Sequence, residues 1–178
     1  MENYALAIAN YFIDLAHSDG KPIRPLKLMK LVYIAHGYIL ALLDKPTDGA
    51  KLEEVEAWQY GPVFPSVYYS FKQYGSQPID KKTTVFDFNK IGSGEDCVYT
   101  PSLECDDEKR VCEFVWRNYR NFKDSELVSK LHMDGTPWKE CYKQGLNVVI
   151  PDKATKRYYT LVAQNISKRI NKQSKKDA

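Results

Sequence analysis

The most apolar stretch of the chain is residues 26–43, LKLMKLVYIAHGYILALL, and it decides the fold class. Its hydrophobic residues recur at the three- and four-residue spacing of one helix face. They form a stripe of Leu28, Leu31, Val32, Ala35, Ile39 and Leu42, and further apolar side chains spread to other faces. A helix that is apolar nearly all round is normally buried. We therefore expect a central helix here, with the other elements packed around it.

Helical spacing also appears on both sides of this stretch, at residues 2–17, 65–75, 106–119, 124–132, from 136 and from 151, where the last stripe includes Ile170. Thr136-Pro137 is a strong start signal, an N-cap residue followed by proline at the first helical position. Gly75 is a typical C-cap. The sequence predicts a mainly α fold, with about seven helices around the central apolar helix and a small minor β-sheet or hairpin.

The strands of that sheet are predicted from short alternating patterns. Residues 52–59, which begin at Leu52, form the clearest one, and Gly61 and Pro62 then predict a turn over residues 60–63. Two weaker strands are expected at 83–88 and 97–100. We expect the turn to work as a tight elbow between the first strand and the next helix.

The chain has 178 residues, with 43% hydrophobic and 28% charged residues, which is typical of one globular domain. We assign residues 1–170 to this domain and 171–178 to a basic tail. The net charge of +3 is concentrated from Lys168 onward, where five basic residues meet one acid, so the body is close to neutral. Because nucleic-acid binding normally requires a basic stripe on the fold itself, this distribution argues against a nucleic-acid partner.

The four cysteines form no CxxC pair, and residues 1–4 lack the basic start of a signal peptide. No apolar run reaches the roughly 20 residues that span a bilayer. We therefore expect a cytoplasmic protein with reduced thiols and no membrane association.

No catalytic constellation is visible in the sequence. The histidines His17, His36 and His132 fall in three different predicted helices, and none belongs to an HExxH pair. No cysteine and histidine spacing suggests a metal site, and no glycine-rich phosphate loop is present. We predict no enzyme activity, no metal and no cofactor, and we keep a hydrolase that uses His36 or His132 as a remote alternative.

An unusual aromatic segment follows the first predicted strand, with Trp58 and Tyr60 directly before Gly61-Pro62. Two interpretations stay open. Trp58 packs against the core at a structural elbow, or the segment presents a rigid aromatic patch to a partner, because tryptophan and tyrosine are enriched at binding hot spots.

Four ordered motifs resemble one known family. Residues 25–37, PLKLMKLVYIAHG, resemble its hallmark segment, and residues 56–63, EAWQYGPV, resemble a second one. The pairs Leu131-His132 and Pro137-Trp138 resemble a third, in which Leu131 replaces the usual threonine, and Ile150-Pro151-Asp152 fits the closing helix. Together they span about residues 5–165. The chain is identified by these motifs as similar to the SocA-like Panacea antitoxin domain.

The resemblance implies a type II antitoxin, which binds and neutralises a protein toxin encoded next to it. One branch of the family resembles a proteolytic adaptor that presents its toxin to an ATP-dependent protease. Family members often carry a DNA-binding segment, and we recognise none here. A DNA-binding transcriptional regulator is the alternative function, favoured only by the basic tail, and the hydrolase ranks below it. We predict that the partner surface includes Tyr33, His36, Trp58, Tyr60, Gly61, Pro62, Tyr68 and His132.

Overall fold

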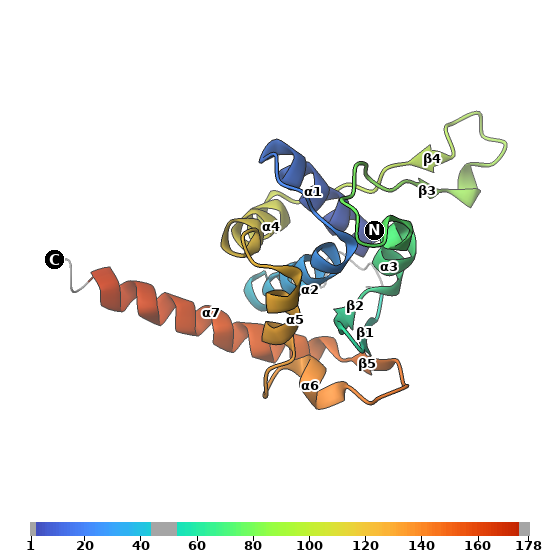
Figure 1. Ribbon diagram of the computed structural model, residues 1–178. Helices are drawn as coiled ribbons and strands as arrows, with labels where there is room; N and C mark the ends of the chain where they lie inside the picture. The colour runs from blue at the N-terminus through green and yellow to red at the C-terminus, as the bar shows by residue number, and fades with distance from the viewer. Residues whose placement is uncertain (1–2, 44–52, 175–178) are drawn as a thin grey trace.

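The computed structural model describes residues 3–43 and 53–174, and it describes the side chains of all of these except 170, 173 and 174. The described part is mainly α, as predicted (Figure 1). Its α-helices are α1 Tyr4–Ser18, α2 Pro25–Leu42, α3 Pro65–Phe71, α4 Asp106–Tyr119, α5 Asp124–Leu131, α6 Pro137–Cys141 and α7 Asp152–Ser174. Its strands are β1 Val55–Trp58, β2 Gly61–Val63, β3 Val85–Phe86, β4 Val98–Tyr99 and β5 Val148–Ile150, and two short 3-10 turns, η1 Lys72–Tyr74 and η2 Phe88–Lys90, complete the set.

Helix α2 forms the centre of the fold, as its apolar sequence predicts. Every residue from Lys27 to Leu40 is buried, and α1, α3, α4, α5 and α7 all contact the helix. By length and composition α2 could also cross a membrane, but 83% of it is buried inside the fold, which is typical of a core helix. Leu42 is the exception to the predicted stripe, because it lies at the last turn of α2 and is 54% exposed.

Helices α2 and α7 cross at Gly37. A Cβ atom at Gly37 would lie 2.1 Å from Cδ2 of Tyr159, so only glycine permits this close approach of the tyrosine ring. Tyr33 and Tyr38 meet the same ring edge-on, with centroid separations of 6.0 and 5.0 Å. Beyond this crossing α7 extends past the rest of the molecule (Figure 1). Residue 170, predicted to continue its apolar stripe, lies outside the described side chains.

A three-stranded antiparallel sheet in the order β2-β1-β5 lies beside the helices. Strand β1 confirms the predicted strand from Val55, and the predicted start at Leu52 lies outside the described residues. The predicted turn over residues 60–63 was wrong, because Gly61–Val63 is strand β2 and the turn is only Gln59-Tyr60. Pro62 is compatible with this strand because β2 lies at the sheet edge, where a missing N–H breaks no ladder bond. Strand β5 was not predicted.

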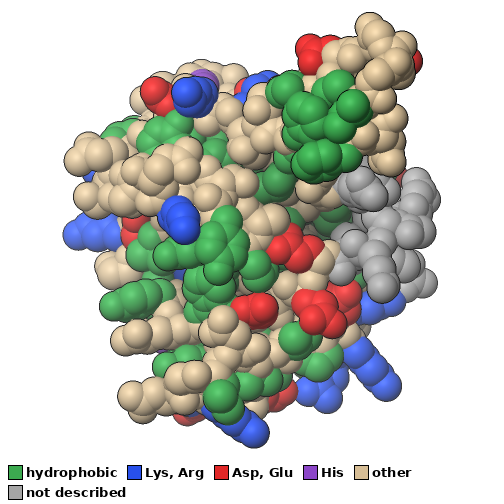
Figure 2. Space-filling model, turned by 90° about the vertical axis from the view of Figure 1, so that its right-hand side faces the viewer, with side chains coloured by type: hydrophobic (Ala, Val, Ile, Leu, Met, Phe, Trp, Pro, Cys, Tyr) green, Lys and Arg blue, Asp and Glu red, His purple; other side chains and the backbone are tan. Residues whose placement is uncertain are grey.

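A second hairpin, β3–β4, projects from the body near α1 (Figure 1). It confirms the two weak strands predicted at 83–88 and 97–100, although each pairs over two residues only. Phe86 and Phe88 are exposed and contact each other, with ring centroids 4.9 Å apart. Figure 2, which views the side toward which this hairpin projects, shows hydrophobic side chains at the surface.

Candidate functional site

The hairpin formed by β1 and β2 is fixed to the central helix by a buried lysine. Lys30 of α2 is fully buried, and its ammonium donates a hydrogen bond to the carbonyl oxygen of Pro62 at 2.9 Å. Burial lowers the pKa of Lys30 to about 7, because a low-dielectric interior disfavours the charged form. Gly61 packs so closely against this side chain that a Cβ would lie 3.1 Å from Nζ of Lys30. Its φ of +103° also requires glycine.

A stack of aromatic rings next to Lys30 also fixes this hairpin. Trp138 of α6 donates its indole N–H to the carbonyl oxygen of Trp58 at 2.8 Å. The imidazole of His132 lies flat on Trp138, with ring centroids 3.5 Å apart and an interplanar angle of 2°. Burial lowers the pKa of His132, and the nearby Lys30 and Lys139 lower it further. The loop after α5 and the hairpin are therefore one packed unit.

Trp58 is half-buried and does pack, as one of the two interpretations expected. Its ring meets Tyr68 of α3 edge-on at 4.8 Å between centroids, and its indole N–H donates to Oε2 of Glu56 at 2.6 Å. These contacts join β1 to α3, so Trp58 and Tyr68 hold the hairpin against the helix that follows it.

Tyr33 and His36 belong to a different part of the fold, the contact between α2 and α7. Both side chains are buried. Nε2 of His36 lies 3.0 Å from Oδ1 of Asp152, at the first residue of α7, and the His36 ring meets Phe64 edge-on at 5.2 Å. The hydroxyl of Tyr33 lies 3.4 Å from Oγ1 of Thr155. These contacts attach the start of α7 to the core.

Of the eight residues predicted for the partner surface, Tyr60 is the one that exposes most of its side chain, 63%. It lies at the two-residue turn between β1 and β2, and both strands beside it are fixed by the buried contacts above. Gly61 and Pro62 are buried, and His132, Trp58 and Tyr68 are half-buried in packing contacts. Tyr60 is therefore the predicted residue best placed to touch a partner directly.

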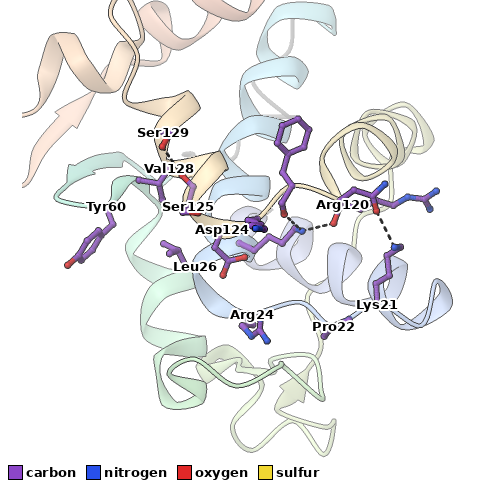
Figure 3. A pocket seen from close by; sticks show the side chains of 14 residues that line it. Lys21, Pro22, Arg24, Leu26, Tyr60, Arg120, Asp124, Ser125, Val128 and Ser129 are labelled. Carbon is purple, nitrogen blue, oxygen red and sulfur yellow. Dashed lines mark hydrogen bonds between the residues drawn. The ribbon is translucent and has the colours of Figure 1, made fainter.

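Tyr60 forms one end of an open cleft of about 1000 Å³ (Figure 3). The cleft lies between the connection from α1 to α2, the connection from α4 to α5, and α5 itself. Leu26 and Val128 lie toward the Tyr60 end, while Lys21 and Arg120 lie at the other end. This cleft was not predicted from the sequence, because its walls come from segments about a hundred residues apart.

The cleft is strongly cationic. Five basic side chains line it, namely Lys21, Arg24, Lys27, Arg120 and Lys123, and Asp124 is the acid among its lining residues. Lys27 is buried and donates to the backbone carbonyl oxygens of Arg120 at 2.6 Å and Phe122 at 2.7 Å. Burial lowers the pKa of Lys27, so the fold places this cation here at a cost in solvation.

The remaining cations of the cleft differ in how they are held. Arg120 bonds the carboxylate of Asp19, and Lys21 donates to the side-chain oxygen of Asn121 at 3.1 Å. Arg24 and Lys123 form no ion pair with any residue that the structure describes. The sequence offered one signal for this site that the prediction did not use. Lys27 and Lys30 are charged residues inside the most apolar segment of the chain, which indicates that both need special partners.

The arrangement supports binding better than catalysis. His36 pairs with a carboxylate and His132 stacks on an indole, so within residues 3–43 and 53–174 neither is positioned as the base of a nucleophile–base pair. Over the same residues no three His, Cys, Asp or Glu side chains gather into a metal-binding group. Exposed Tyr60 and the cationic cleft beside it are the features that a partner could contact.

Comparisons with known proteins agree with the motifs. The family described as antitoxin SocA-like, Panacea domain, matches residues 28–139, which contain α2 from Leu28 onward, the β1–β2 hairpin, the cleft helix α5 and Trp138. The protein named Antitoxin SocA from Caulobacter vibrioides is 34% identical over 134 residues, which cover 75% of this chain and 68% of that protein. No solved structure matches. The chain belongs to the SocA-like antitoxin family, the family of the Panacea domain.

Proposed function

We propose that this protein is an antitoxin that neutralises a cognate protein toxin, encoded next to it, by direct binding. Family membership indicates the antitoxin role. The observation that favours direct binding is the placement of Tyr60, an exposed aromatic on a turn that buried contacts hold in one conformation. A rigid aromatic loses little conformational entropy when a partner covers it, and this is why such residues dominate binding interfaces.

Two accompanying proposals follow from the same role. The four cysteines are free thiols, which agrees with the reducing cytoplasm as the place where the antitoxin meets its toxin. Delivery of the bound toxin to an ATP-dependent protease would make the protein an adaptor as well as an inhibitor. The half-life of the toxin in cells, measured with and without this protein and with the protease gene removed, checks that second proposal.

The direct-binding proposal is tested by Tyr60→Ala. Exposed substitutions usually change stability by less than about 0.5 kcal/mol, so the thermal unfolding curve should stay nearly unchanged. Affinity for the toxin should fall by about 2 kcal/mol, or roughly 30-fold, the threshold of a binding hot spot. Titration calorimetry with the product of the neighbouring gene measures this, and rescue of growth on co-expression gives the cellular readout.

Tyr69→Ala is a matched control, because Tyr69 is 59% exposed on α3 and does not line the cleft. It should leave both stability and affinity unchanged. If the Tyr60→Ala protein is folded and binds the toxin with unchanged affinity, Tyr60 is not part of the interface. A wild-type protein that neither binds nor neutralises the neighbouring gene product would contradict the proposed function itself.

A further inference from the structure

The cleft beside Tyr60 carries more positive charge than its own contacts compensate. Lys27 has three N–H donors, and the structure gives two of them backbone carbonyl acceptors. Both acceptors are neutral carbonyl groups, so no carboxylate is hydrogen-bonded to the buried ammonium of Lys27. The side-chain Nε of Arg120 is also buried without a hydrogen-bond partner among the described residues. Both groups belong to the same cleft wall.

Arg24 and Lys123 add two exposed cations at the rim. Arg24 directly precedes α2 and Lys123 directly precedes α5, so each lies at a helix N-terminus. The unsatisfied N–H groups at a helix N-terminus carry partial positive charge and strengthen the attraction for anions. Asp124 and Glu126 lie in the first turn of α5, and Glu126 accepts a hydrogen bond from the backbone N–H of Lys123, whereas the first turn of α2 has no acid. The side chains of Arg24 and Lys123 themselves are exposed. The rim and the floor of the cleft therefore favour the same kind of ligand, a negatively charged one.

The walls of the cleft are apolar between these charges. Leu26 and Val128 lie toward the Tyr60 end of the cleft, which Tyr60 also lines (Figure 3). An occupant that matches both features carries carboxylates next to an apolar side chain. We infer that the cleft receives an acidic, extended segment of the protein partner, with carboxylates at Arg24, Lys27 and Lys123 and an apolar residue against Leu26 and Tyr60. This inference rests on the proposed function, because it names the part of the toxin that the antitoxin grips.

A nucleic acid is the other anionic ligand to consider, and the cleft fits it less well. Binding to a phosphate backbone normally uses a basic stripe that extends along the fold. The cations of this cleft are interrupted by the apolar side chains of Leu26 and Val128, which also line it. Leu26 and Val128 would face phosphates without any favourable contact. These observations favour a peptide.

The test is the double charge reversal Arg24→Glu with Lys123→Glu in the full chain. Both changes place an acid near a helix N-terminus, where negative charge is tolerated, so the fold should remain intact. We expect the affinity for the neighbouring gene product to fall at least about tenfold at about 0.15 M salt, mainly through slower association. The loss should shrink at about 0.5 M salt, because salt screens exposed charges.

The matched control is Lys168→Glu with Lys172→Glu, which changes the net charge equally on exposed residues of α7. Equal loss of affinity in both double variants would mean a non-specific charge effect and would overturn the inference. Unchanged affinity in the cleft variant would also overturn it, while leaving the antitoxin function in place. If the wild-type protein does not bind the neighbouring gene product at all, this result contradicts the proposed function, on which the inference about the cleft rests.

A labelled DNA duplex titrated under the same conditions separates the two anionic ligands. Tighter binding of the duplex than of the toxin, lost in the cleft variant and kept in the α7 variant, would assign the cleft to nucleic acid and overturn the peptide inference. We expect the wild-type protein to bind the duplex weakly. The cleft variant and the α7 variant should change the affinity for the duplex to the same extent.

Discussion

The buried lysine of the central helix gives the sharpest prediction for stability, because its pKa makes folding depend on pH. Folded Lys30 loses its proton near pH 7, whereas in the unfolded chain the same group keeps its proton up to about pH 10.5. Between these values the unfolded state binds more protons than the folded state. The free energy of unfolding must therefore rise with pH across this interval.

The size of the effect follows from the width of the interval. Each pKa unit corresponds to about 1.4 kcal/mol, so the rise between about pH 7 and about pH 9.5 has an upper bound of roughly 3 kcal/mol. Buried Tyr4 and Cys112 act in the opposite direction at alkaline pH, because burial raises their pKa values and the unfolded chain ionises first. A variant that retains both groups cancels their contribution when it is compared with the wild type.

Lys30→Met is that variant, since methionine has a similar length and no charge. Urea unfolding followed by circular dichroism at several pH values from about 6.5 to about 9.5 gives the free energy of unfolding of each protein. The difference between wild type and Lys30→Met should shift by about 2–3 kcal/mol in favour of the wild type as pH rises. Lys168→Met, at an exposed position, should follow the wild type. A pH profile of Lys30→Met parallel to the wild type would refute the assignment of this titration to Lys30.

Two further predictions concern the core and the tail. Leu31→Ala should lower the free energy of unfolding by about 2–5 kcal/mol and Trp138→Ala by about 3–5 kcal/mol, because both are buried and leave cavities; thermal melts near the wild-type value would contradict this. Deletion of residues 172–178 should leave toxin neutralisation intact in the growth-rescue assay, because these residues are polar or charged apart from Ala178 and offer no large apolar anchor to a partner. Loss of rescue with a folded domain would make the tail a functional arm.

Periodicity and end signals predicted the helical part of the fold well, because they act within one segment. The stripe of residues 26–43 identified the central helix. Thr136 indeed caps α6, accepting a hydrogen bond from the backbone N–H of Lys139. Strand β5 was missed because three residues, Val148–Ile150, are too short for an alternation to register. The turn at 60–63 was misplaced because glycine and proline usually mark turns, and only the edge position of β2 makes Pro62 compatible with a strand.

The candidate site was harder to predict because its parts meet only in the folded chain. Exposure of Tyr60 depends on a two-residue turn whose length the sequence did not reveal. The cations of the cleft come from segments near residues 21–27 and 120–123, and their proximity follows from the packing of α4 and α5 against α2. No prediction was made for Lys30, whose burial depends on the Pro62 carbonyl oxygen reaching it from another element.

The motifs that identify the family overlap only in part with the residues that we propose to touch the partner, because Leu26, Lys27 and Tyr60 lie inside the motifs and Arg24 and Lys123 lie outside them. In the segment EAWQYGPV, six of the eight residues are buried or half-buried, and only Gln59 and Tyr60 are exposed. Lys30 and Trp138 bond the backbone of Pro62 and Trp58 and so hold the two strands in place. Gln59 and Tyr60 form the exposed turn between these strands. Substitutions at the turn and the cleft rim can therefore alter the partner without a cost to the core. On our proposal, the charge of the cleft selects the partner, and the buried contacts at Lys30 and Trp138 preserve the shape of the turn beside it.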